Sequence, residues 1–112
     1  MNRAPLVFLL IMLSACDQRY EPKIFFEQGK YEKSFNLWLP LAIKGDVEAQ
    51  NYIAIHYYLG LGRKRNFKVA KEWFEKAAQS NYSDAQYNLG VMYENGDSIK
   101  KDYINAYKWF YL

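Results

Sequence analysis

The stretch AQNYIAIHYYLGLG at residues 49–62 returns as AQYNLGVMYENG at residues 85–96, a shift of 36 positions. The match continues downstream, where the dipeptide Trp-Phe at 73–74 returns at 109–110. One period upstream the match fades, although Trp38 still falls opposite an aromatic residue. Self-similarity at a period of about 20 to 50 residues is typical of proteins that stack one unit on the next. The sequence therefore predicts a solenoid of about two and a half units.

Each unit has the pattern of two α-helices. Ala49, Ile53 and Tyr57 recur at every fourth position, which places them on one face of a helix. The second half of the unit sets small alanines opposite large aromatic side chains, a combination that lets helices approach closely. The chain is therefore expected to be all-α. The apolar face of the next unit is formed by Ala85, Leu89 and Tyr93.

Polar residues and glycines mark where these helices begin and end. Asp46, Asn66 and Asp102 each precede a periodic segment, and their side-chain oxygens can accept hydrogen bonds from the free N–H groups of a first helical turn. Gly60 and Gly96 follow the first helix of each unit, where a left-handed residue commonly ends a helix. The sequence therefore predicts helix pairs joined by short loops.

Two further residues bear on the helix boundaries. Asp84 lies at the start of a periodic segment, where it is expected to cap the helix or to interact favourably with its dipole. Pro40 lies between Leu39 and Leu41 and is expected to kink or end the first apolar helix, because proline lacks a backbone N–H group.

The pattern of these residues resembles the Sel1-like repeat, a relative of the tetratricopeptide repeat. The resemblance implies a right-handed α-solenoid of antiparallel helix pairs with a concave groove, over residues 29–112. Two positions depart from the family pattern, since Ser98 replaces a loop glycine and Ala54 stands where Gly90 would allow the closest helix approach. The chain also lacks the cysteines that clamp the disulfide-rich members of the family. The resemblance is carried by residues 29–46, 49–62, 69–81, 85–96 and 105–112.

Residues 1–16, MNRAPLVFLLIMLSAC, have the pattern of an export signal. A positive start precedes a run of eight apolar residues from Leu6 to Leu13, which is too short to span a bilayer as a helix. The segment ending at Cys16 resembles the lipobox of bacterial lipoproteins, which implies cleavage before Cys16 and its lipidation. Asp17 resembles a signal for retention at the inner membrane. We therefore expect a signal peptide at 1–15, a tether with the start of the first helix at 16–28, and a periplasm-facing lipoprotein.

The composition excludes several classes of function. The 112 residues allow one domain, and a net charge of +3 is too small for the usual nucleic-acid binder. A single cysteine and a single histidine leave little for a metal site, and we expect neither metal nor cofactor. The histidine, His56, is expected to be an ordinary side chain of the first helix. We find no catalytic pattern and expect no enzymatic activity.

The candidate binding surface is the concave face that the resemblance implies. Residues of the first helices that lie outside the repeat pattern would line this face, and tyrosines there are typical anchors of protein interfaces. The hypothesis is that a protein or peptide partner binds in this groove. Alternatively, Tyr58 and Tyr87 simply close the core between repeats. The candidate partner-binding residues are Asn51, Ile55, Tyr58, Tyr87, Val91 and Glu94.

Two other surfaces were candidates for contacts. Basic residues in equivalent loops are expected on one edge of the stack, where they would meet anionic lipids or an acidic partner, or simply be solvated. The chain ends at Leu112 inside a helix, which indicates either a truncated member or a helix covered by a second copy or a partner, with possible self-association. The basic residues are Arg63, Lys64, Arg65, Lys100 and Lys101.

The sequence leaves several functions open. The leading hypothesis is a membrane-anchored periplasmic module that binds a protein, and one variant of it is an immunity protein that neutralises a periplasm-delivered toxin such as a secreted lipase. A binder of cell-wall fragments is an alternative, which predicts that Trp38, Trp73 or Trp109 is exposed for sugar stacking. The repeat pattern instead predicts that Trp73 and Trp109 are buried. A degenerate fragment without function is a further possibility.

Overall fold

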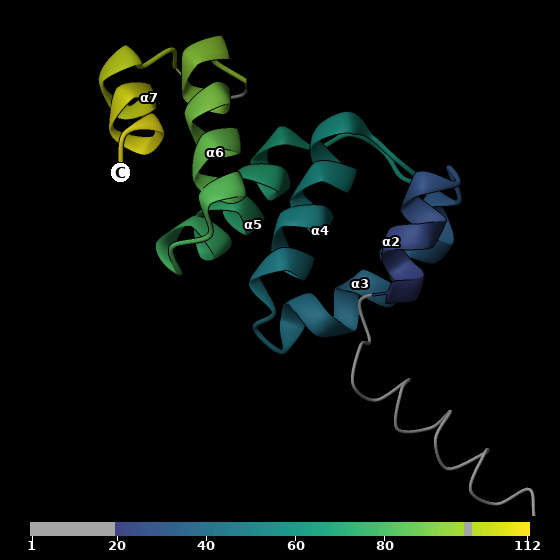
Figure 1. The fold of residues 1–112 in the computed structure, drawn as a ribbon. Helices are drawn as coiled ribbons and strands as arrows, with labels where there is room; N and C mark the ends of the chain where they lie inside the picture. The colour runs from purple at the N-terminus through teal and green to yellow at the C-terminus, as the bar shows by residue number, and fades with distance from the viewer. Residues whose placement is uncertain (1–19, 98–99) are drawn as a thin grey trace, which may run out of the picture.

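The computed structural model describes residues 20–97 and 100–112, and the described chain forms six α-helices (Figure 1). The predicted signal peptide at 1–15, together with Cys16, Asp17 and Ser98, lies outside the described residues. The helices are α2 (Tyr20–Glu27), α3 (Tyr31–Ile43), α4 (Val47–Leu59), α5 (Phe67–Gln79), α6 (Ser83–Asn95) and α7 (Tyr103–Phe110).

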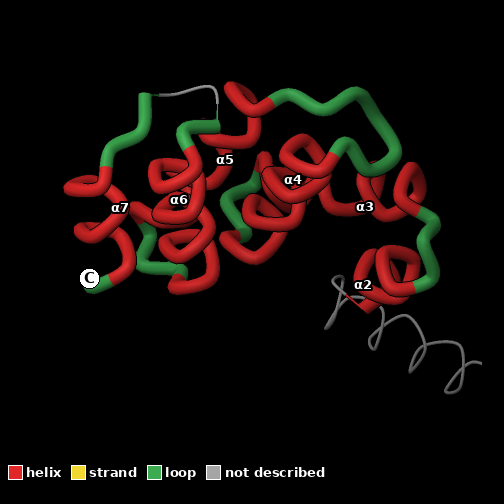
Figure 2. Tube along the Cα trace, turned by 90° about the horizontal axis from the view of Figure 1, so that it is seen from above, coloured by secondary structure: helices red, strands yellow, loops and turns green. Residues whose placement is uncertain are grey.

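The helices form a row of antiparallel pairs. Each helix packs mainly against the helices next to it in the sequence, from α2 to α7. Figure 2 shows the pairs side by side along the row, with the chain running up one helix and down the next. The prediction of an all-α solenoid is therefore confirmed, with two repeats, α4–α5 and α6–α7, preceded by the pair α2–α3. We call α2, α4 and α6 the first helices.

The predicted helix caps are present. Asp46 accepts a hydrogen bond from the backbone N–H of Ala49 at 2.9 Å. Asn66 and Asp102 cap α5 and α7 in the same way, although Tyr82 and not Asp84 occupies the capping position of α6. Asp84 lies in the first turn of α6, where its negative charge interacts favourably with the helix dipole. The expected left-handed ends of α4 and α6 are also found, at Gly60 and Gly96.

The glutamine of the repeated Ala-Gln pair has a structural role. Gln50 Nε2 donates a hydrogen bond to the carbonyl oxygen of Ala42 at 3.2 Å, and Gln86 Nε2 donates to the carbonyl oxygen of Ala78 at the same distance. Each bond fastens the start of a first helix to the end of the helix before it. The bond recurs because the Ala-Gln pair occupies matching positions in the two repeats, and each carbonyl oxygen accepts this bond in addition to one from the backbone.

The core consists of two apolar clusters joined by half-buried aromatic residues. Alanines in both clusters let the helices approach, and large rings, two from α3 and one from α5, fill the space between pairs. Tyr57 and Trp73 pack against both clusters and make the core continuous. The first cluster is Phe35, Trp38, Ala42, Ala49 and Ile53; the second is Ala54, Ala70, Phe74, Ala77, Ala78, Ala85, Leu89 and Met92.

The N-terminal part adds detail to the expectations. Pro40 does not end α3, because the helix continues to Ile43 and the proline lies on an exposed part of its last turn. The stack begins before residue 29, because α2 is a folded helix within the segment 16–28, for which the sequence predicts a tether and the start of the first helix. Pro22 of α2 is fully buried, and the Phe26 ring packs edge-on against His56 at 5.4 Å.

Gly62 holds the loop after α4 against the start of α3. Its φ is +70°, and a Cβ atom at this position would lie 2.8 Å from the backbone nitrogen of Glu32 and 2.9 Å from the carbonyl carbon of Tyr31. Gly29 has nearly the same φ, +75°, with open space where its Cβ would be. An alanine at Gly62 would therefore suffer both backbone strain and steric overlap, whereas an alanine at Gly29 would suffer backbone strain alone.

We predict that Gly62→Ala lowers the free energy of unfolding by about 3 kcal/mol, because strain and overpacking add. Gly29→Ala should cost only the strain of a left-handed alanine, about 1 kcal/mol. Urea unfolding followed by circular dichroism measures both. Equal losses in the two variants would show that the loop does not rest on α3.

Candidate functional site

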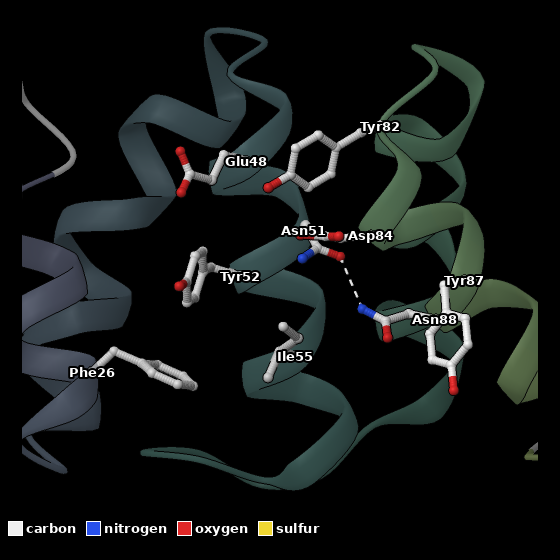
Figure 3. Close-up of a pocket in the computed structure, with 9 residues that line it drawn as sticks. All are labelled: Phe26, Glu48, Asn51, Tyr52, Ile55, Tyr82, Asp84, Tyr87 and Asn88. Carbon is white, nitrogen blue, oxygen red and sulfur yellow. Dashed lines mark hydrogen bonds between the residues drawn. The ribbon is translucent and has the colours of Figure 1, made fainter.

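A cavity of about 380 Å³ lies between the first helices α4 and α6, with Phe26 of α2 at its edge (Figure 3). We call it the polar pocket. In Figure 3 the side chains of α4 lie between Phe26 on one side and Tyr82, Tyr87 and Asn88 on the other. The polar pocket is lined by Phe26, Glu48, Asn51, Tyr52, Ile55, Tyr82, Asp84, Tyr87 and Asn88.

The repeat places matching positions of α4 and α6 across this pocket. Glu48 and Asp84 are one period apart, so that both first helices contribute a carboxylate. The next two matching positions carry asparagine and tyrosine in opposite order, Asn51-Tyr52 in α4 and Tyr87-Asn88 in α6. This exchange brings the two amides together, and Asn88 Nδ2 donates a hydrogen bond to Asn51 Oδ1 at 3.2 Å.

The charges around the polar pocket are mostly negative. Glu48 forms an ion pair with Lys23 of α2 at 2.6 Å. Burial, followed by the nearby carboxylates of Glu48 and Asp84, raises the pKa of Tyr82 to about 12. Burial and Glu48 likewise raise the pKa of Tyr52 above its usual value. Both hydroxyl groups therefore stay neutral over the physiological pH range and can donate hydrogen bonds.

A second cavity of about 240 Å³ adjoins the first, and we call it the apolar pocket. Ile55 and Asn88 belong to both pockets, so the two form one continuous groove along α4 and α6. The walls are mainly apolar, with Phe74 of α5 among the lining residues. The apolar pocket is lined by Ile55, Tyr58, Leu59, Phe74, Asn88 and Val91.

Five of the six candidate partner-binding residues line one of these pockets. Asn51 and Tyr87 line the polar pocket, Tyr58 and Val91 line the apolar pocket, and Ile55 lines both. Asn51 is 4% exposed, so that it forms part of a wall and has little free surface. The sixth residue, Glu94 near the end of α6, is exposed and lines neither pocket.

The two tyrosines behave differently. Tyr58 is half-buried against Phe67 and donates a hydrogen bond of 2.6 Å to Asp97, which follows α6. It therefore both lines a pocket and joins the two repeats, which combines the two interpretations of this residue. Tyr87 is 61% exposed, with its ring 5.4 Å from that of Phe110. Tyr87 is thus the large ring most available to a partner in the groove.

The basic residues do not form one free patch. Figure 2 shows the α4–α5 and α6–α7 loops at the same edge, and Lys64, Lys100 and Lys101 are exposed there. Arg63 is an exception to the expected patch. Its guanidinium carbon lies 3.1 Å from the centre of the Phe35 ring, and it donates a hydrogen bond to the Tyr57 hydroxyl. Arg63 is partly buried, and this cation–π contact holds its guanidinium against the fold.

One tryptophan lies in each of the second helices of the pairs, α3, α5 and α7. Trp38 is fully buried, whereas Trp73 and Trp109 are half-buried, so neither prediction about the two C-terminal tryptophans is met in full. The ammonium group of Lys76 lies 4.3 Å from the centre of the Trp73 ring. Trp73 therefore offers no open face of the kind that stacks on a sugar ring.

His56 is fully buried in α4 and lies away from both pockets. Burial lowers the pKa of its imidazole, and Nδ1 lies 3.0 Å from the carbonyl oxygen of Leu61. Within residues 20–97 and 100–112, no group of three acidic, histidine or cysteine side chains is placed to bind a metal ion. In the same ranges, no helix has both the length and the apolar character to cross a membrane.

The outer face of α7 carries apolar side chains that nothing in the described chain covers. Tyr107 and Tyr111 stack with ring centres 4.5 Å apart. The matching positions of the preceding repeat are Lys71 and Glu75, which form an ion pair, so α7 is less polar there than α5. The exposed residues are Tyr103, Ile104, Tyr107, Tyr111 and Leu112.

Sequence reasoning missed part of the groove. Phe26 comes from a helix for which the repeat gave no match, and Tyr82 lies in a loop position that is Asp46 in the preceding repeat. Asn88 and Asp84 could have been found, because they occupy the positions that match Tyr52 and Glu48. The sequence predicts for Asp84 only a role at the start of its helix.

A family model and several known proteins match this chain. The model of the Sel1 repeat matches residues 47–82 and 83–112. The chain is 40% identical over 84 residues to the ERAD-associated E3 ubiquitin-protein ligase component HRD3A of Arabidopsis thaliana, which covers 75% of this chain and 12% of that protein. The first curated relatives are much longer, and the chain covers 12% of each of them.

Two solved structures from bacteria are similar in fold and sequence. A Sel1 repeat protein from Oxalobacter formigenes has a TM-score of 0.76 and 33% identity, covering 81% of this chain and 37% of that one. The protective antigen c5321 of uropathogenic Escherichia coli has a TM-score of 0.78 and 30% identity, covering 83% of this chain and 21% of that one.

Proposed function

The chain belongs to the Sel1 repeat family, and on that premise we propose that it is a protein-binding module whose partner lies in the groove along α4 and α6. The observation that supports the proposal most is the continuity of the polar and apolar pockets, which share Ile55 and Asn88. A groove with a polar and an apolar part offers both orientation and buried area to a polypeptide. HRD3A of Arabidopsis thaliana is itself named as a component of a larger ligase, which is compatible with a binding role.

The proposed module works from the membrane surface. Residues 1–16 have the pattern of a lipoprotein signal, and acyl chains on Cys16 would anchor the chain at the periplasmic side. Asp17 favours the inner membrane. The module itself carries no proposed catalytic step; it positions a partner near the bilayer.

Self-association through α7 is proposed as a second contact. The exposed Ile104 and the tyrosines of its outer face form an apolar surface, which a second copy would cover. Sedimentation of the full chain in non-ionic detergent tests this contact, with Ile104→Glu expected to shift a dimer to a monomer. A parent chain that is monomeric at high concentration would exclude it.

We predict that a photo-crosslinking amino acid at Tyr87 captures a partner in living cells, whereas the same amino acid at Glu72 captures none. Tyr87 is an exposed ring in the groove, and Glu72 is an exposed residue of α5 outside both pockets. Adducts are detected by blotting membrane fractions and identified by mass spectrometry.

The same experiment tests the anchor and the groove separately. Cys16→Ser is expected to remove the protein from the membrane fraction without changing its fold. A partner captured equally from both positions, or from neither at equal expression, contradicts the groove. The identity of the captured protein distinguishes an adaptor from an immunity protein, since the latter would capture a toxin.

A further inference from the structure

The groove has a charge opposite to that of the chain as a whole. Glu48 and Asp84 line the polar pocket, and Glu27 is close enough to raise the pKa of Tyr52 further. Lys23 of α2 pairs with Glu48. Among the described residues that line the polar pocket, two are acidic, Glu48 and Asp84, and none is basic, in a chain whose net charge is +3. An electrostatic field of this sign attracts cations and repels acidic segments.

Aromatic rings complete the polar pocket. Phe26, Tyr52, Tyr82 and Tyr87 line it, and their π faces are weakly negative. Phe26 meets Tyr52 edge-on at 5.1 Å, while Tyr52 stacks on Trp38 at 4.5 Å, so these walls are held rigidly. Rigid aromatic rings next to carboxylates are the surroundings in which a lysine or arginine side chain is stabilised.

We propose that the polar pocket binds a lysine or arginine side chain of the partner polypeptide, and that the apolar pocket binds an apolar side chain of the same segment. The inference rests on the proposed function of the groove and names the chemistry of its ligand. The partner is a basic and apolar segment, in contrast to an acidic peptide or a neutral sugar.

The shared residues of the two pockets fit such a segment. In an extended peptide, side chains two residues apart point to the same side, about 6 to 7 Å from each other. Adjoining pockets can therefore take residues i and i+2. Asn88 belongs to both pockets and lies at their junction, where the oxygen of its amide can accept a hydrogen bond from the peptide backbone between these residues.

Four fluorescent peptides test the proposal. The parent peptide is Gly-Ser-Thr-Lys-Thr-Leu-Ser-Gly with both ends blocked, and the others replace its lysine with glutamine or glutamate, or its leucine with serine. Binding to the full chain in non-ionic detergent is measured by fluorescence anisotropy. We expect the lysine peptide to bind at least about fivefold more tightly than the glutamine and serine peptides, the glutamate peptide to bind most weakly, and binding to weaken with added salt.

Two variants, each of which removes one carboxylate charge, test where the lysine peptide binds. Asp84→Asn should weaken binding of the lysine peptide at least about fivefold. Glu72→Gln removes an exposed charge of α5 outside both pockets and should leave binding unchanged. Circular dichroism checks that both variants keep the parent fold. Asp84→Lys should reverse the preference and favour the glutamate peptide.

Equal binding of the lysine and glutamate peptides would overturn the inference, as would equal effects of Asp84→Asn and Glu72→Gln. Absence of any peptide binding up to millimolar concentration would also overturn it. If crosslinking at Tyr87 nevertheless captured a partner, the proposed function would survive and only the cationic chemistry would fail. If Tyr87 captured nothing while the lysine peptide bound through Asp84, the pocket would stand without a cellular protein partner.

Discussion

Replacing Trp38 with alanine is expected to lower the free energy of unfolding by about 4 kcal/mol. The Trp38 side chain is 0% exposed in α3, and its ring stacks on Tyr52 with centres 4.5 Å apart. Truncating a buried tryptophan removes its transfer free energy and leaves a cavity that the neighbouring helices fill only in part. A loss of this size is a large share of the stability of a small domain. Urea unfolding of the full chain measures it.

The repeat supplies a matched control for this site. Trp38 is one period before Phe74, which is buried at the same place in the next helix pair. Trp38→Phe should therefore cost no more than about 1 kcal/mol, because phenylalanine still fills most of the space. The substitution also removes the indole Nε1–H group, which is buried and has no hydrogen-bond partner among the described residues. Equal losses for the alanine and phenylalanine variants would show that the two positions are not equivalent.

The loss of the Trp38 ring should also affect ligand binding in the groove. Tyr52 lines the polar pocket, and Trp38 supports the opposite face of its ring. Trp38→Ala is therefore expected to weaken the binding of any ligand in this pocket. Trp38→Phe keeps an aromatic ring behind Tyr52 and should leave this binding unchanged. The buried Trp38 of α3 thus acts on the binding surface through the Tyr52 ring of α4.

Local signals in the sequence predicted the helices and their ends. A side chain such as Asp46 caps a helix through a hydrogen bond to a residue three positions away, so that its effect can be read from neighbouring residues. Gly60 and Gly96 end helices for an equally local reason. The 36-residue period adds longer-range information, because matching residues of each repeat have matching surroundings.

Contacts outside the repeat were not predicted. Arg63 looks like a member of a basic loop, yet it lies on Phe35, which is far away in sequence. Phe26 reaches the groove from α2, where no match to the repeat was found. Both contacts depend on how helix pairs are oriented, and a single sequence does not encode that orientation in a local pattern. The repeat nevertheless placed five candidate residues on one groove, because the first helices share a face.

His56 of α4 occupies the position that matches Met92 of α6 in the next repeat. His56 is 0% exposed, and its ring is 5.4 to 5.5 Å from those of Phe26 and Phe35. Nδ1 faces the carbonyl oxygen of Leu61, which can only accept a hydrogen bond, so the hydrogen of the neutral ring is on Nδ1. His56→Ala removes a packed ring and this hydrogen bond and should cost about 3 kcal/mol.

The fold should also be sensitive to mild acid. Burial lowers the pKa of His56 below its ordinary value of 6.5; the hydrogen bond to the Leu61 carbonyl offsets part of this effect, and the charge of Arg63 adds a smaller lowering. Below pH 6.5 the unfolded chain therefore binds more protons than the folded chain. The stability that the neutral ring contributes is complete above pH 6.5 and is lost as the pH falls through the lowered pKa.

His56→Met tests this origin of the acid sensitivity, because methionine occupies the matching position of the next repeat and does not titrate. The parent is expected to lose stability between pH 7.5 and 5, whereas the variant should remain nearly constant over this range. Urea unfolding at several pH values gives both curves. Carboxylates such as Asp102, whose pKa is lowered by hydrogen bonds from the backbone of Asn105, affect both chains alike at still lower pH. Parallel curves between pH 7.5 and 5 would assign the acid sensitivity to groups other than this histidine.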